Sequence, residues 1–127
     1  MALKYRLLQK INPRTPEAPG KFYAQSITTG DVKLRQLAKE IAEISTVNIV
    51  DIMAVIESFI QLIPRHIGQG QIVRLGEFGS FYVGISSKGA EQETDFKESM
   101  IKKVKIYFRP GSVLKKEISA LEFEKQS

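Results

Sequence analysis

The stretch that most restricts the fold of this chain is the sequence VRLGEFGSFYV, residues 73–83. Its apolar residues alternate with polar ones on both sides of Gly76 and Gly79, which predicts a strand, a tight turn and a second strand. A further alternating stretch, residues 101–108, runs into Arg109 and then Pro110-Gly111, a pair that ends a strand. These segments predict a small antiparallel sheet. Ser112 can cap a short helix that runs to about residue 121.

Two helices are predicted before this sheet, at residues 32–44 and 48–66. The first has one apolar stripe at helical spacing, and Thr28, Thr29 and Asp31 are its candidate N-caps. Asn48, followed three residues later by Asp51, resembles a capping box for the second helix. The second helix is apolar over more than one face, which favours burial by a partner chain as well as by its own. Pro64 is expected to kink or end it.

The N-terminal residues predict a β-hairpin. Residues 3–11 and 21–27 alternate as strands do, and the segment between them contains three prolines and a glycine. The domain prediction is an N-terminal hairpin at residues 1–30, a main domain at residues 31–121 and a tail at residues 122–127.

Over residues 31–119 the order of these elements, with the Gly76-to-Gly79 turn and the Pro110-Gly111 corner, resembles the bacterial histone-like family of HU and integration host factor. The resemblance implies an α+β dimer in which two N-terminal helices pack on β-sheets, followed by a short C-terminal helix. It implies a homodimer, with a heterodimer as the alternative, and double-stranded DNA as partner. The residues that it assigns to the dimer core are Phe59, Phe78, Phe81 and Phe108.

Charge is unevenly distributed in a chain whose net charge is +5. Residues 101–116 contain no acidic residue, and strand alternation places Lys103, Lys105 and Arg109 on one face. Cations at two- and four-residue spacing on one strand suit a row of phosphates. The alternative is an ordinary solvated face, whose lysines keep the sheet edge from aggregating. The predicted DNA-binding residues are Arg74, Lys103, Lys105, Arg109, Lys115 and Lys116.

Weaker candidates lie at the turn, at the helix start and in the N-terminal loop: Gly79, Ser112, Lys10, Asn12, Pro13 and Arg14. Lys10 to Arg14 enclose an Asn-Pro pair between cations, although prolines also simply shape surface loops. HU-like proteins insert a long basic arm with a proline tip into the minor groove. The corresponding residues here, 84–100, are few, contain no proline and are acidic from Glu91 to Glu98. Glu77 also departs from the family pattern, because a carboxylate repels phosphate.

Enzyme chemistry is not expected. The chain has no cysteine and one histidine, His66, so neither a metal site nor a cofactor or small-molecule substrate is predicted. It has no apolar run long enough for a membrane span and no signal peptide, which predicts a cytoplasmic protein. The resemblance to the HU family implies a location in the bacterial nucleoid. The predicted function is low-specificity, architectural DNA binding that condenses or bends DNA. The alternative is a dimeric HU-like module that has lost DNA binding and binds protein.

Overall fold

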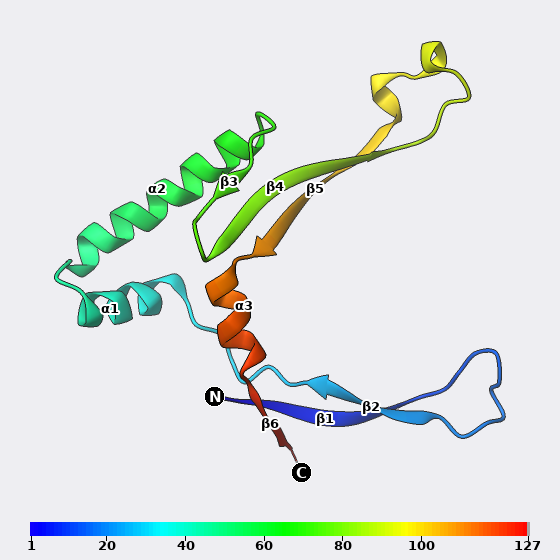
Figure 1. The fold of residues 1–127 in the computed structure, drawn as a ribbon, viewed down its shortest axis with the longest axis horizontal. Coiled ribbons are helices and arrows are strands. Elements are labelled where there is room, and N and C mark those ends of the chain that lie inside the picture. Colours follow the sequence, from blue (N-terminus) through cyan, green and yellow to red (C-terminus); the bar gives the residue numbers. More distant parts are fainter. Residues whose placement is uncertain (127) are drawn as a thin grey trace.

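The computed structural model describes residues 1–126 of the chain, a mixed α+β fold. Its two sheets each have three strands, in the orders β2-β1-β6 and β3-β4-β5. Figure 1 shows two connections between the sheets, one through α1 and α2 and the other through α3. The element bounds are β1 Ala2–Lys10, β2 Lys21–Ser26, α1 Leu34–Ile44, α2 Ile49–Ile67, β3 Val73–Arg74, β4 Gly79–Ser87, β5 Ile101–Pro110, α3 Ser112–Ser119 and β6 Glu122–Lys125.

The two glycine motifs of the sequence meet in the structure. The turn between β3 and β4 is closed by the amide of Phe78, which donates to the Leu75 carbonyl at 3.2 Å. Gly111, directly after β5, donates its amide to the Phe78 carbonyl at 2.8 Å. A Cβ on Gly111 would collide with the backbone of Glu77, so the corner needs glycine for close approach. The turn and the Pro-Gly corner thus form one packed unit.

Helix α2 confirms the predicted cap, whereas α1 does not. Asn48 accepts a hydrogen bond from the amide of Asp51 at 3.0 Å, and its side-chain amide donates to the Asp51 carboxylate at 3.0 Å. The N-cap of α1 is Lys33, without a side-chain hydrogen bond, so the prediction of a cap among Thr28, Thr29 and Asp31 is wrong.

Pro64 lies inside α2, which continues to Ile67. The proline removes one backbone donor only, and the Gly68 amide still donates to the Pro64 carbonyl at 2.9 Å. Of the two predicted outcomes for this residue, an end to the helix is therefore wrong. Gly68 is the C-cap of α2.

The N-terminal hairpin is confirmed, with β1 and β2 antiparallel. The predicted tail is wrong for residues 122–125, because these form β6, which pairs in parallel with β1. The amide of Glu122 donates to the Met1 carbonyl at 3.0 Å and that of Gln126 to the Tyr5 carbonyl at 2.9 Å, which gives the free edge of β1 a partner. Ser127, the end of the predicted tail, lies outside the described residues.

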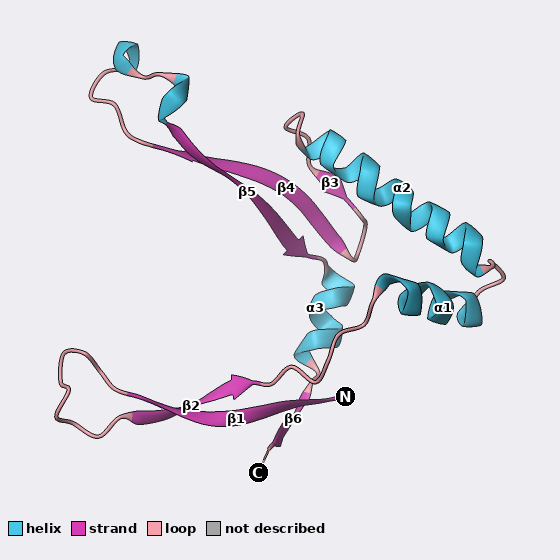
Figure 2. Ribbon diagram, turned by 180° about the vertical axis from the view of Figure 1, so that it is seen from behind, coloured by secondary structure: helices cyan, strands magenta, loops and turns pink. Residues whose placement is uncertain are grey.

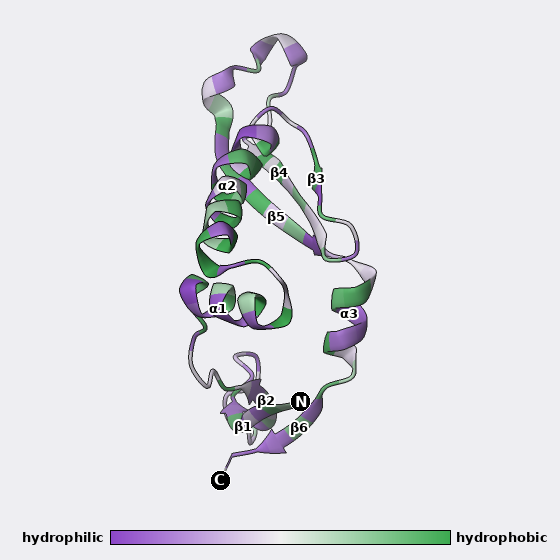
Figure 3. Ribbon diagram, turned by 90° about the vertical axis from the view of Figure 1, so that its left-hand side faces the viewer, coloured by the Kyte–Doolittle hydropathy of each residue, from purple (hydrophilic) through white to green (hydrophobic). Residues whose placement is uncertain are grey.

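A single chain buries little. Ala38, Ile52 and Ile67 are the buried apolar residues among residues 1–126, whereas Phe59 on α2 is 47% exposed. The accessible surface is 11114 Å², against about 6,800 Å² for a compact monomer of this mass. Figure 3 shows apolar colouring along α2 and β5. Much of the apolar surface that would form a core is therefore exposed to solvent in one chain.

Candidate nucleic-acid interface

The predicted cations of the sheet lie in cross-strand rows on one face. Arg74 on β3 pairs with Ser80 on β4, and Ser80 pairs with Arg109 on β5, so two guanidinium groups flank one hydroxyl. Further along the ribbon, Lys105 pairs with Gly84 and Lys103 with Ser86. We call this the cationic face; its residues are Arg74, Ser80, Tyr82, Gly84, Ser86, Lys103, Lys105, Tyr107 and Arg109.

Two tyrosines occupy the centre of the cationic face. Tyr82 and Tyr107 are cross-strand partners whose rings stack with centroids 5.3 Å apart and planes inclined by 19°. A Cβ on Gly84 would come within 2.7 Å of the Tyr107 ring, so this glycine leaves room for the ring over the backbone. The stacked pair lies between the arginine row and the two lysines.

The arginine row lies beside a shallow hollow. Ile72, Arg74, Ser80, Tyr82 and Arg109 line this space of about 220 Å³. Guanidinium, hydroxyl and phenol groups are the donors that proteins most often present to phosphate oxygens. The hollow is therefore suited to one anionic group held between the two arginines.

The opposite face of the same ribbon is apolar, as strand alternation predicts. We call it the apolar face; its residues are Val73, Phe81, Val83, Ile85, Val104, Ile106 and Phe108. The Phe108 ring lies 4.8 Å from Phe81 and 5.5 Å from Phe78, centroid to centroid. Three of the four predicted dimer-core phenylalanines therefore cluster, and the fourth, Phe59, lies on α2. Ile106 is nevertheless 70% exposed and Val104 is 69% exposed in one chain.

Lys115 and Lys116 are not part of the cross-strand rows. They lie on α3, which follows β5 directly. The N-cap of α3 is Gly111 rather than Ser112, so the predicted capping role of Ser112 is wrong. Gly79 is buried, and a Cβ there would lie 2.6 Å from the Phe108 ring and from the Arg109 carbonyl oxygen. Close packing therefore accounts for Gly79 without a ligand.

The N-terminal candidates sit in the loop between β1 and β2. Asn12 accepts the amide of Arg14 through its side-chain oxygen at 3.0 Å, and its carbonyl accepts the amide of Thr15 at 3.0 Å. The Asn-Pro pair is thus part of a turn held by its own hydrogen bonds. The sequence prediction named Lys10 here but missed Lys21, its direct partner on β2. Alternation of residues 21, 23 and 25 in the predicted strand was the available signal.

The ribbon ends in an acidic loop, residues 88–100, which we call the distal loop. It folds into two 3-10 turns, Glu93–Asp95 and Glu98–Met100. Figure 2 shows these turns at the far end of β4 and β5. The distal loop contains Glu91, Glu93, Asp95 and Glu98 against Lys88 and Lys97.

Comparison with known protein families identifies the family of this chain. Residues 1–125 match the family described as an HU domain fused to wHTH, Ig or glycine-rich motif. The chain belongs to this HU-domain family. The matched residues include the N-terminal hairpin and β6, so the match covers both sheets. The resemblance inferred from residues 31–119 is confirmed.

A solved structure supports the same fold. A protein of Bacteroides vulgatus ATCC 8482, described as a candidate bacterial DNA-binding protein, superposes with a TM-score of 0.67 at 14% identity. The superposition covers 98% of this chain and 47% of that one, so this HU-family chain spans about half the length of its structural neighbour. No curated protein sequence matches this chain. Within residues 1–126, no helix is long and apolar enough to cross a membrane, and no cluster of potential metal ligands occurs.

Proposed function

We propose that this HU-family chain binds double-stranded DNA with low sequence specificity, through phosphate contacts of the cationic face, and acts architecturally in the nucleoid. The observation that carries the proposal is the row Arg74–Ser80–Arg109, which continues along the ribbon to Lys105 and Lys103. Side chains on one face of a strand repeat every 6–7 Å or so, a spacing close to that of successive phosphates. Positive charge in such a row neutralises a backbone without reading bases.

The proposal includes a dimer as the binding unit. The apolar face lies directly behind the cationic face, and several of its side chains are exposed in one chain. Covering these side chains with a second copy would bury apolar surface at a gain of about 25 cal/mol per Å². Dimerisation would also double the number of cations presented to one duplex.

The acidic distal loop shapes the proposed mode of contact. Carboxylates at the end of the ribbon repel phosphate, so the contact is assigned to the body of the sheet and not to an arm inserted in the minor groove. The bend in the DNA would then arise from wrapping, not from a wedge between base steps.

Salt dependence tests the proposal. If four to six phosphates are neutralised, the logarithm of the binding constant should fall with the logarithm of salt concentration at a slope of about −4 to −5. The triple variant K103Q/K105Q/R109Q should reduce the magnitude of that slope by about 2–3. Affinity should vary little between duplexes of unrelated sequence. A wild-type protein that shifts no duplex at low salt would instead favour the protein-binding alternative.

A further inference from the structure

Two lysines face each other across the far end of the N-terminal hairpin. Lys10, the last residue of β1, is the direct cross-strand partner of Lys21, the first residue of β2. Directly opposed side chains of a strand pair share one face, with Cβ atoms about 5 Å apart, and like charges there are destabilising. Edge lysines can serve to prevent aggregation, but that role does not require two lysines to be direct cross-strand partners. The lysine pair therefore carries a stability cost that sheet protection does not explain.

An aromatic ring lies near one lysine of this pair. Tyr23 lies two residues after Lys21 on the same face, and the Lys10 ammonium lies 5.6 Å from the centroid of its ring. A cation over a tyrosine face is attracted to the ring and loses part of its freedom before any ligand arrives. Tyr23 is itself 49% exposed. Its phenol is therefore available to donate a hydrogen bond to a ligand near the Lys10 ammonium.

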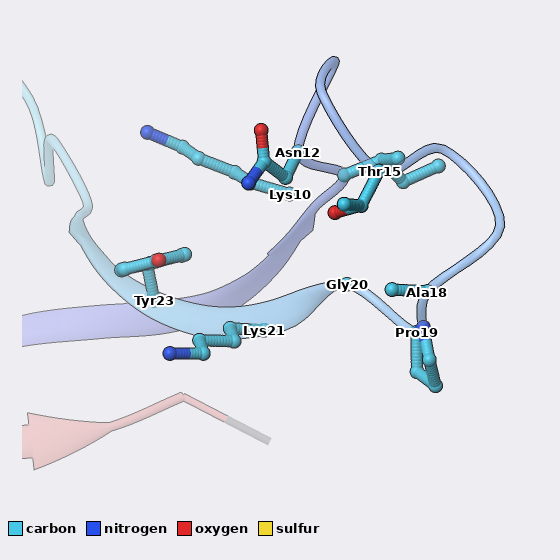
Figure 4. Close-up of a pocket in the computed structure, with 9 residues that line it drawn as sticks. Lys10, Asn12, Thr15, Ala18, Pro19, Gly20, Lys21 and Tyr23 are labelled. Atoms are coloured by element: carbon cyan, nitrogen blue, oxygen red, sulfur yellow. The ribbon is translucent and has the colours of Figure 1, made fainter.

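The pair also lies next to a concave surface. Lys10, Lys21 and Tyr23 line a hollow of about 430 Å³ between the strands and the loop, together with Asn12 and Thr15. Figure 4 shows these side chains with the loop beyond them. The hollow contains no acidic lining residue. It is suited to an anion with several oxygen atoms.

Positive charge is concentrated at the loop end of the hairpin, beside the lysine pair. Glu17 is the single acidic residue among residues 1–30. Glu122 and Glu124 lie on the same face of the sheet but pair with Ala2 and Lys4, at the opposite end of β1. The loop end of the hairpin carries Lys10, Arg14 and Lys21 against Glu17, so positive charge is in excess there, whereas near β6 it is compensated.

We propose that Lys10, Lys21 and Tyr23 form a second phosphate-binding surface, separate from the cationic face, which contacts the backbone of the same duplex. The inference rests on the proposed function for the identity of the ligand. Figure 1 shows the hairpin and the β4–β5 ribbon projecting to the same side of α3. The hairpin would thus extend the length of duplex that one protomer contacts.

Matched charge removal tests this surface. The variant K10Q/K21Q should flatten the salt slope for duplex DNA by about 1.8, since each lost phosphate contact removes about 0.9. K10R/K21R should keep the wild-type slope. The control K33Q/K39Q removes the same charge from exposed positions at α1, outside both surfaces, and should leave the slope unchanged.

A second readout needs no DNA. Because K10Q/K21Q removes a like-charge pair, its unfolding midpoint at low salt should rise above that of the wild type, and added salt should narrow the difference. An unchanged slope in K10Q/K21Q, alongside a flattened slope in K103Q/K105Q/R109Q, would overturn the second surface and leave the proposed function intact. Equal flattening by K33Q/K39Q would also overturn it. Absence of any duplex binding by the wild type would overturn both proposals.

Discussion

At the scale of single residues, the structure explains why two separate glycine motifs occur in this sequence. The Glu77 backbone rests against Gly111, and the Phe78 carbonyl accepts the Gly111 amide at 2.8 Å. The sequence predicts each turn by itself, because glycine and proline have local conformational signatures. It does not predict that the turns touch, since that contact depends on how β3, β4 and β5 pair.

The substitution Gly111→Ala tests this contact. An added methyl group would meet the backbone of Glu77 and Phe78, which cannot rotate away as a side chain could. We expect a loss of about 1–3 kcal/mol in the free energy of unfolding, as for other overpacked positions. Gly89→Ala is the control, because nothing lies within 4 Å of a Cβ there. Denaturant unfolding measures both variants, and equal stabilities would contradict the packed corner.

In the candidate site, too, local sequence signals predict what lies along one strand but not what strand pairing brings together. Alternation along one strand correctly placed Lys103, Lys105 and Arg109 on one face, because that periodicity is a property of the backbone. The row that joins Arg74 to Arg109 through Ser80 depends on register between strands. Register is determined by the turns and by an irregularity at Ser86/Ser87, and neither is encoded by alternation.

At the scale of elements, prediction succeeded where the signal was long or local and failed where it was short or distant. The two helices and the hairpin have clear periodicity, and Asn48 caps α2 as predicted. The start of α1 was misplaced because three polar residues offered equally good caps. Strand β6 was missed because it has four residues, and its pairing partner, β1, lies more than a hundred residues away in the chain.

Neutralising the acidic distal loop tests whether this element contacts DNA. Changing Glu91, Glu93 and Asp95 together to Gln should leave DNA binding unchanged or tighten it slightly, because the change removes carboxylates that would face phosphate. The salt slope should stay near the wild-type value, since no cation is lost. Fluorescence anisotropy of a labelled duplex over a salt series measures both quantities. Loss of binding on neutralising this loop, with normal binding by K103Q/K105Q/R109Q, would show that the wrong surface had been assigned.

At the scale of the whole molecule, a single chain exposes more surface than a compact monomer of the same mass would. Helix α2 leaves Phe59 exposed, and the apolar face of the ribbon leaves Ile85, Val104 and Ile106 exposed. Such surface is normally covered by another chain. The sequence had already indicated this for α2, whose apolar residues exceed one stripe. The structure adds a second uncovered surface, the apolar face of the ribbon.

A substitution on the apolar face distinguishes a dimer from a monomer, because only a dimer would bury that face. In one chain Ile106 is 70% exposed, so lysine at this position would cost a monomer little. In a dimer that buries the apolar face, Ile106→Lys would place an unpaired charge in the interface, at a cost of several kcal/mol. The control Ile44→Lys changes a residue that is 86% exposed at the end of α1. By sedimentation at micromolar concentration, we expect the wild type and Ile44→Lys to be dimers and Ile106→Lys to be monomeric or unfolded. A wild type that sediments as a stable monomer of 14.3 kDa would contradict the dimer, and Ile106→Lys would then keep the wild-type unfolding midpoint.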